Sequence, residues 1–207
     1  QMLQELQDWI RRGGSERDST ALFDDPTSAQ SLAFEWLLQD ELSQDGLTSK
    51  VLERYVLAVF YYSTDGPNWI GSEDIHFLSE REVCSWNNGL IKRNESDSGN
   101  LEGVYCESAF TLEFLQFKGF GLKGTIPWEL SLLSNLRRLH LNSNSLTGTL
   151  PEELCQLSSL ISFSVKENRL KGTISTDWGR LTAMTTLDVS VNAFTGTLPS
   201  ELGNLTA

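Results

Sequence analysis

A 24-residue repeat occupies this chain from about Leu112 to its last residue. The repeating blocks open with LQFKGFGLKGTIP, LHLNSNSLTGTLP, FSVKENRLKGTIS and LDVSVNAFTGTLP, and they begin at Leu115, Leu139, Phe163 and Leu187. Between the blocks an apolar residue recurs at every third position, as in Leu130, Leu133 and Leu136. A fixed period of this length predicts a solenoid, in which each coil buries its apolar face against its neighbours.

Each block has positions with a distinct expected role. The Leu-x-Leu pair predicts a short strand with two inward side chains, and the strands of successive coils are expected to pair into a parallel sheet on the concave face. Asn144, Asn168 and Asn192 recur at one position and predict a buried ladder, because an amide can both donate to and accept from adjacent coils. Phe120 replaces Asn in the first block, which is expected to face a cap.

Glycine and proline mark the turns of each block. The recurring Gly predicts positive φ or close packing of coils, and Pro127, Pro151 and Pro199 fix the chain before the convex segment. Ser175 takes the proline position in the third block, and we expect a local weakening there.

The block spacing resembles the plant-type leucine-rich repeat, LxxLxLxxNxLxGxIPxxLxx, over roughly 95 residues. This resemblance implies an α/β fold, a right-handed leucine-rich-repeat solenoid with a second, smaller sheet. The elements CSW and GVYC, which contain Cys84 and Cys106, resemble the N-terminal cap of plant leucine-rich-repeat ectodomains, in which two cysteines are paired. The preceding RYVLAVFYYSTDGPNW is similar to the N-terminal region of diatom leucine-rich-repeat proteins.

The cysteines leave alternatives open. A Cys84–Cys106 disulfide would contribute roughly 3 kcal/mol; otherwise the pair is two free thiols or half a metal site. His76 and His140 are too dispersed to complete a zinc site, so we expect no metal and no cofactor. Cys155 is interpreted as a small, partly buried filler on the convex side, with an intermolecular bond as the alternative.

The charge is unevenly distributed. The chain of 207 residues has a formal net charge of -12; residues 1–110 carry 20 acidic and 8 basic residues, and residues 111–207 carry 8 of each. This break predicts two parts, a helical, disulfide-stabilised cap (1–110) and four repeats, the last incomplete (111–207). An acidic chain argues against nucleic acid and anionic membranes as partners. No apolar run is long enough to span a bilayer, so we expect any membrane anchor or kinase to lie outside this sequence.

Helical periodicity recurs in the first 62 residues. Residues 1–12 and 28–43 predict helices on either side of a polar linker at 13–27. Thr48 is a plausible N-cap for a third helix that extends to about Tyr62. The wide apolar stripe of this helix is expected to pack on the open first coil of the solenoid.

The outward residues of the four concave strands, here called the concave strip, are the candidate binding surface. They include three basic residues and one acid, so the sequence predicts a locally basic strip that suits a peptide, an anionic sugar or an acidic protein segment. Phe114 and His140 are expected to add stackable surface. The alternative is a merely solvated face. The candidate ligand-binding residues are Phe114, Gln116, Lys118, Arg138, His140, Asn142, Ser164, Lys166 and Asp188, and the strip also contains Ser162, Thr186 and Ser190.

Other functions were weighed against this one. A row of threonines at 125, 149, 173 and 197 is compatible with ice binding, although Thr commonly occupies exposed strand positions. Motifs for phosphate binding, metalloproteases and serine hydrolases are absent from the sequence, so we expect no enzyme activity.

Two sequons, at Asn94 and Asn204, permit N-glycosylation. With the expected disulfide they favour the secretory pathway, the extracellular space or the cell surface. The resemblance therefore implies a receptor-like module that binds a protein, peptide or glycan. The alternative is a structural or adhesive wall component that binds carbohydrate through the same face.

Overall fold

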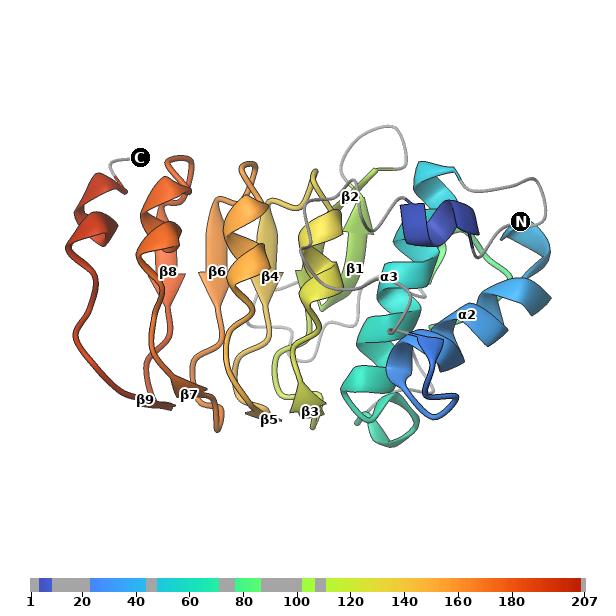
Figure 1. The fold of residues 1–207 in the computed structure, drawn as a ribbon, viewed down its shortest axis with the longest axis horizontal. Helices are drawn as coiled ribbons and strands as arrows, with labels where there is room; N and C mark the ends of the chain where they lie inside the picture. Colours follow the sequence, from blue (N-terminus) through green and yellow to red (C-terminus); the bar gives the residue numbers. More distant parts are fainter. Residues whose placement is uncertain are drawn as a thin grey trace, which may run out of the picture.

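The fold was analysed in a computed structural model, which describes residues 4–8, 23–43, 48–70, 77–86, 102–106 and 111–205. Figure 1 shows the coils of a solenoid side by side along the long axis of the molecule, with α2 (Ala29–Gln39) and α3 (Ser49–Ser63) at one end. The residues at 4–8 are helical, whereas the rest of the predicted first helix and most of the predicted linker lie outside the described residues. None of the helices in the described ranges has the length and apolar character required to cross a membrane.

The main sheet has five strands in the order β1-β2-β4-β6-β8. The strands β2 (Leu112–Gln116), β4 (Arg138–His140), β6 (Ser162–Ser164) and β8 (Thr186–Asp188) are parallel, as the repeat predicts. Equivalent block positions are in register, because Leu115 pairs with Leu139, Leu139 with Phe163 and Phe163 with Leu187. The predicted stacking of coils is therefore confirmed.

The fifth strand was not anticipated from the sequence. β1 (Gly103–Cys106) pairs antiparallel with β2 and covers the edge of the first coil. It supplies backbone partners on the side where no earlier coil exists. The first coil is therefore closed by a strand as well as by the helices of the cap.

The opposite edge of each coil carries a smaller strand. β3 (Lys123–Thr125) pairs with β5 (Ser145–Thr147), and β7 (Lys171–Gly172) pairs with β9 (Ala193–Phe194). These two-stranded sheets confirm the second, smaller sheet that the resemblance implied. Gly124 has a φ of 91° next to the backbone carbonyl of Ser63, so it combines the positive φ and the close packing expected of this position.

The convex side consists of short 3-10 helices, η6 (Trp128–Leu132), η7 (Glu152–Gln156), η8 (Thr176–Arg180) and η9 (Ser200–Asn204). Pro127, Pro151 and Pro199 are the residues that precede three of them. Ser175 precedes η8, and its hydroxyl accepts a hydrogen bond from the N–H of Asp177 (3.2 Å). This capping bond offsets the loss of proline, a compensation that the predicted weakening did not include.

The ladder asparagines connect the coils. Asn168 accepts from the N–H of Leu146 (3.0 Å) and donates to the carbonyls of Leu141 and Val165 (both 2.9 Å). Asn144 likewise accepts from the N–H of Leu122 and donates to the carbonyl of Phe117. Asn192 accepts from the N–H of Leu170 and donates to the carbonyl of Val165. Each amide thus satisfies the backbone of the preceding coil as well as its own.

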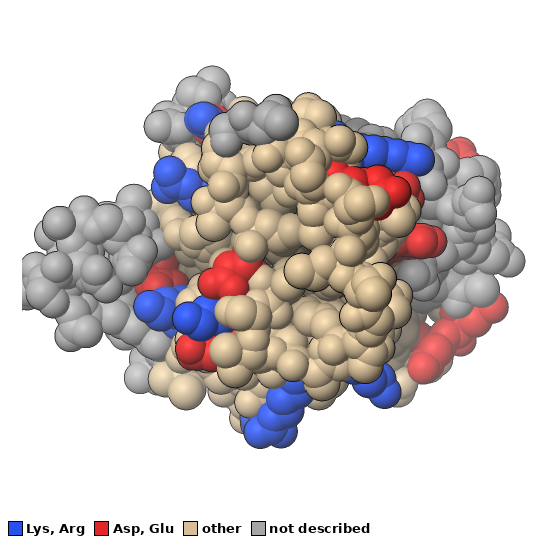
Figure 2. All heavy atoms as spheres, turned by 90° about the vertical axis from the view of Figure 1, so that its left-hand side faces the viewer, with Lys and Arg blue, Asp and Glu red and all other residues tan. Residues whose placement is uncertain are grey.

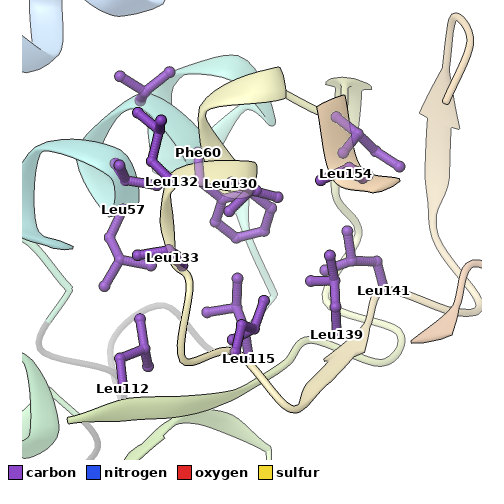
Figure 3. Packing of buried hydrophobic residues seen from close by; sticks show 14 of the residues in the cluster. Leu57, Phe60, Leu112, Leu115, Leu130, Leu132, Leu133, Leu139, Leu141 and Leu154 are labelled. Carbon is purple, nitrogen blue, oxygen red and sulfur yellow. The ribbon is translucent and has the colours of Figure 1, made fainter. Parts of the chain in front are cut away.

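The cap is built on α2 (Ala29–Gln39) and α3 (Ser49–Ser63), joined by η2 (Glu41–Ser43). Thr48 caps α3 through its side chain, as predicted. Figure 3 shows Leu57 and Phe60 of α3 beside the leucines of the first coil, and the rings of Phe60 and Phe117 are 5.5 Å apart. The core is continuous from α3 into the coils, so a division at residue 110 stays a prediction.

A buried ion pair fixes the cap internally. Arg54 donates to the carboxylate of Asp40, and both side chains are 2% exposed. The guanidinium also donates to the carbonyls of Ser79 and Arg81 and lies over the rings of Trp36 and Trp86. These bonds hold the segment that contains η5 (Val83–Ser85) against α3.

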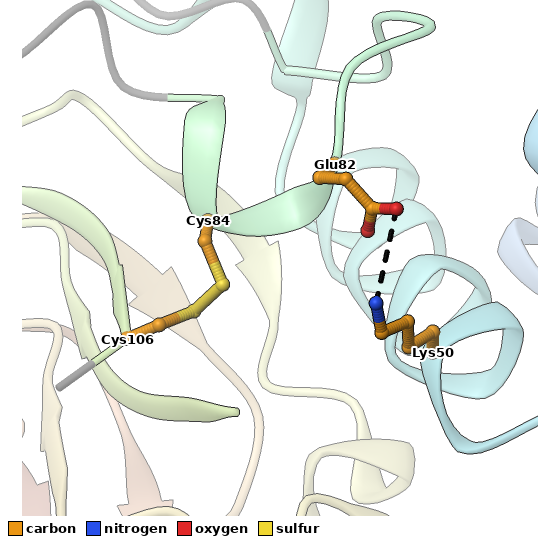
Figure 4. Close-up of a disulfide and its surroundings, with 4 residues drawn as sticks. All are labelled: Lys50, Glu82, Cys84 and Cys106. Atoms are coloured by element: carbon orange, nitrogen blue, oxygen red, sulfur yellow. Dashed lines mark ion pairs between the residues drawn. A yellow bond between two sulfur atoms is a disulfide. The ribbon is translucent and has the colours of Figure 1, made fainter. Parts of the chain in front are cut away.

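The disulfide joins this segment to the sheet. Cys84 on η5 is bonded to Cys106 at the end of β1, with Cα atoms 5.6 Å apart. Figure 4 shows the disulfide beside the ion pair of Lys50 and Glu82, in which Nζ of Lys50 lies 3.9 Å from Oε1 of Glu82. The pairing implied by the resemblance is confirmed, and it anchors β1 to the cap. The other short helix of the cap is η3 (Gly66–Asn68).

The last coil has an open edge. Figure 2 looks onto this end of the molecule, where most of the surface facing the viewer is uncharged. Leu139 and Phe163 are fully buried, whereas Leu187 is only partly buried. Val191 and Leu198 are 65% and 72% exposed. These exposures follow from the position of the last described coil, since no further described coil covers it.

Candidate concave binding face

The concave strip forms rows that run across the sheet. One row contains Phe114, Arg138, Ser162 and Thr186, and the next contains Gln116, His140, Ser164 and Asp188. A shallow depression of about 220 Å³ lies on this face, centred on the second row. Of the predicted binding residues, the depression is lined by Gln116, Lys118, His140, Asn142, Ser164 and Asp188; it is also lined by Glu102, Ser162 and Thr186. Phe114, Arg138 and Lys166 lie outside it.

Gln116 differs from the prediction of an accessible outward residue. It is 8% exposed, because Gly103 of β1 pairs alongside it. Glu102, which immediately precedes β1, was missed entirely. It is 6% exposed, and its carboxylate accepts from the backbone N–H of Lys118 (2.9 Å). No sequence signal placed Glu102 here, because the pairing of β1 with β2 was itself unexpected.

The predicted local excess of positive charge is wrong. Glu102 adds an acid at the β1 side of the strip, and Glu167 lies 3.8 Å from the ammonium group of Lys166. With Asp188, these acids balance the three basic residues of the strip. The face is therefore polar and near neutral, which removes the reason to prefer an anionic ligand on net charge alone.

Phe114 is not a free stacking platform. The guanidinium of Arg138, its register partner on β4, lies over the ring at 5.1 Å from the centroid. Arg138 itself is exposed. The strip therefore presents a stacked guanidinium where the sequence predicted an open aromatic ring.

His140 is coupled to the neighbouring strand. Its Nε2 lies 2.8 Å from the hydroxyl of Ser162. Burial, and secondarily the positive charge of Arg138, lowers the pKa of His140 below its ordinary value of 6.5. The imidazole is therefore neutral at pH 7 and can either donate or accept.

Asp188 is held in its ionised form. Its carboxylate accepts from the hydroxyl of Ser190 (2.6 Å) and from the backbone N–H of the same residue (3.1 Å). The hydroxyl contact is the main cause of a lowered pKa, and the charge of Lys166 contributes in the same direction. The depression thus has one fixed negative group at its β8 side.

A second depression of about 360 Å³ lies where the main strands begin. It is lined by Thr111, Glu113, Asn135, Arg137 and Ser159, and Arg137 contacts the carboxylate of Glu113 (3.4 Å). This depression was not predicted from the sequence. The sequence signal that could have indicated it is a charged pair at one block position: Glu113 and Arg137 stand where the later coils have Ile161 and Thr185.

The threonine row is exposed in every coil, at residues 125, 149, 173 and 197. It lies along the small sheets, next to a second row in which Thr147 donates to the carbonyl of Gly124 (3.0 Å) and Thr195 to that of Gly172 (3.3 Å). The outer row is therefore a regular line of exposed threonines, and the methyl groups of Thr125, Thr149 and Thr173 lie next to the glycine of the following coil.

The remaining predicted sites are peripheral. Asn94 and His76 lie outside the described residues, and Asn204 is exposed at the end of η9. Burial raises the pKa of the half-buried Cys155 thiol to about 12, so this thiol is a poor nucleophile. Within the described ranges, His, Cys, Asp and Glu do not gather into a group that could hold a metal ion.

Comparison with known proteins identifies the repeat. Residues 135–157 and 183–205 match the Leucine Rich Repeat family model. None of the curated proteins matches the chain.

Solved structures extend the comparison. The BIR3–SERK2 complex from Arabidopsis thaliana is 31% identical, with a TM-score of 0.48 over 56% of this chain and 64% of that one. The BIR2 ectodomain from Arabidopsis thaliana is 31% identical, with a TM-score of 0.49 over 57% and 66%. A plant ice-binding protein is 23% identical, with a TM-score of 0.54 over 70% and 42%, which shows a shared fold. The chain thus spans less than two thirds of the length of each.

Proposed function

Since this chain carries leucine-rich repeats, we propose that it is a recognition module whose concave strip binds a protein, peptide or glycan partner outside the cell. The observation that carries the proposal is the register of the strip. Strand pairing aligns equivalent outward residues from coil to coil, so polar side chains such as His140 and Ser164 hold fixed positions on a rigid sheet. Groups preorganised in this way lose little entropy when a ligand binds.

The dimensions of the strip limit the ligand. Three strand-to-strand steps of about 4.8 Å give a width of roughly 14 Å, which matches about four residues of an extended peptide. The depression of about 220 Å³ is open and polar, so it would take a side chain or a sugar ring but would not enclose a longer ligand. Affinity would then come from many shallow polar contacts along the surface.

Location outside the cell is supported by the chemistry of the cap. The Cys84–Cys106 disulfide requires an oxidising compartment to persist. The BIR2 structure to which the chain is similar is that of an ectodomain. We expect Asn94 and Asn204 to be glycosylated on secretion, and mass spectrometry of the protein from a eukaryotic secretory host would detect both glycans.

The function is tested by screening peptide and glycan arrays with the wild-type protein and with Ser164→Arg. This substitution places a long side chain in the middle of the strip without touching the core. The control is Gln156→Arg, which adds the same group on the exposed convex side. We expect Ser164→Arg to weaken the binding of selective ligands at least tenfold, and we expect the control to leave their binding unchanged. Ligands that bind the wild-type protein and both variants equally would rule out the concave strip as their binding site.

Ice binding is a second candidate, favoured by the exposed threonine row at 125, 149, 173 and 197. The fold shared with a plant ice-binding protein is compatible with it. Measurement of ice recrystallisation tests this function directly. Activity that survives Ser164→Arg and is lost in Thr149→Lys would assign it to the threonine row, whereas no inhibition by the wild-type protein would exclude it.

A further inference from the structure

We propose that Arg138, stacked on Phe114, is the anchoring subsite for a carboxylate of the ligand that binds the concave strip. The inference rests on the proposed function and deepens it, because it names a chemical group of the ligand and the coils at which this group binds. It depends on the geometry of one side chain and on the charges around it.

The first observation is the stacking itself. The guanidinium of Arg138 lies 5.1 Å from the centroid of the Phe114 ring, and the two residues are register partners on β4 and β2. Contact with the ring restricts the long side chain of Arg138, and it leaves the N–H groups at the edge of the guanidinium directed away from the ring face. A planar group with parallel N–H donors matches the two oxygens of a carboxylate.

The second observation is that Arg138 has no carboxylate partner among the described residues. Several other basic side chains of the described residues lie within 4 Å of an acid, among them Arg54 with Asp40, Arg137 with Glu113, Arg180 with Asp177 and Lys166 with Glu167. The row that contains Arg138 continues with two hydroxyl residues, Ser162 and Thr186, and carries no acid. The charge of Arg138 is thus not compensated by its neighbours.

The acids of the strip are engaged elsewhere. The carboxylate of Glu102 accepts from the N–H of Lys118, and that of Asp188 accepts from Ser190. Asp188 also lies two strands away from β4, roughly 10 Å across the sheet. Neither acid competes with a ligand for the guanidinium.

The third observation supplies a further donor. Ser162 is the register partner of Arg138 on β6, and its hydroxyl lies 2.8 Å from Nε2 of His140. When Nε2 carries the proton and donates to this oxygen, the hydroxyl hydrogen of Ser162 is available to a ligand on the β6 side of Arg138. Because the guanidinium lies over Phe114 on β2, the other neighbour of β4, this hydroxyl is available to an adjacent group of the ligand and not to the anchored carboxylate itself.

The probe for this subsite is acetate, titrated against ¹⁵N- and ¹³C-labelled protein at constant ionic strength. Acetamide has the same shape without the charge, and sulfate carries charge on a tetrahedral group. We expect saturable shifts of the Arg138 side-chain N–H and of the His140 ring signals with acetate, none with acetamide and weaker ones with sulfate. Equal or stronger binding of sulfate would overturn the choice of a carboxylate.

Variants separate an anchoring site from ordinary attraction between surface charges. Phe114→Leu keeps the charge but removes the ring, and we expect acetate to bind about 2- to 5-fold more weakly, as the loss of one exposed cation–π contact implies. Arg138→Lys keeps the charge without the planar donors and should weaken acetate similarly. The control is Arg169→Gln, an exposed arginine without a described aromatic contact, which should leave the titration unchanged. Arg169 signals that shift as strongly as those of Arg138 would overturn the proposal.

The two proposals fail in different ways. If acetate shows no preference for Arg138 while Ser164→Arg still abolishes ligand binding, the anchor is wrong and the concave strip remains the binding face. If Ser164→Arg leaves every ligand bound, the proposed function fails regardless of what acetate does.

Discussion

The raised pKa of Glu53 predicts that the stability of the protein depends on pH between 4.5 and about 7. This residue lies on α3, where its carboxyl group is partly buried and accepts from the backbone N–H of Leu112 on β2. Burial raises its pKa from 4.5 to about 7, against the opposing effects of this hydrogen bond and of Lys50, while Glu82 adds to the rise. Glu53 therefore titrates at the junction between the cap and the first coil.

The magnitude and sign follow from linkage. A pKa of about 7 in the folded state and 4.5 in the unfolded state corresponds to about 3 kcal/mol, which partial exposure reduces to about 2 kcal/mol. Since the folded state holds the proton more tightly, the contribution to stability is fully present below pH 4.5. It is lost as the pH rises to 7 and stays lost above that value.

Glu53→Gln removes this titration and keeps an acceptor for Leu112. We expect the variant to equal the wild type in unfolding free energy at pH 4 and to exceed it by about 2 kcal/mol at pH 8. Urea denaturation followed by tryptophan fluorescence at a series of pH values measures the difference, in which all other titrating groups cancel. The control is Glu152→Gln on the exposed convex surface, which makes the same substitution away from the junction. A difference that is constant with pH, or larger in acid, would refute the role of burial.

Three further tests address what holds the coils and the cap together, each by chemical denaturation. Asn168→Ala removes the acceptor of the Leu146 N–H, whereas the carbonyls of Leu141 and Val165 each keep a second amide donor, from Asn144 and Asn192; the variant should cost about 2 kcal/mol, and a cost below 1 kcal/mol would mean that water replaces the amide. Gly124→Ala introduces a Cβ against a backbone carbonyl at positive φ and should cost more than 2 kcal/mol, whereas Gly203→Ala, with open space around it, should cost less than about 1 kcal/mol. Replacing Cys84 and Cys106 together by serine should lower stability by about 3 kcal/mol, and an unchanged midpoint would show that the cap is held by packing alone.

The repeat allowed accurate prediction of the inward positions. Four copies of one block fix the phase of the pattern, so the paired positions of Leu115, Leu139, Phe163 and Leu187 follow from their spacing. The positive φ of Gly124 and the side-chain cap of Thr48 could be predicted equally well, because each depends on a local preference of one residue type. Local rules and repetition are the features that a single sequence displays.

Contacts made outside the repeat could not be predicted in the same way. The four residues of β1 lack a repeated pattern, and their antiparallel pairing with β2 joins segments from the two parts of the chain. Two errors at the candidate site follow from this one omission, because β1 both buries Gln116 and brings Glu102 into the depression. The expected basic character failed for a related reason: Glu167 lies in a turn beside the strip and was not counted with it.

The division between inward and outward positions determines which binding tests can be interpreted. A substitution at Leu139 or Phe163 would disturb both the core and the face, since both residues are fully buried. Gln116 has the same drawback despite its outward position, because it is buried beside the neighbouring strand β1. Arg138 and Ser164 are different: their side chains leave the sheet on the solvent side, and their backbone bonds do not depend on side-chain identity. Loss of ligand binding in variants of these two residues, at unchanged unfolding free energy, therefore reports on recognition itself.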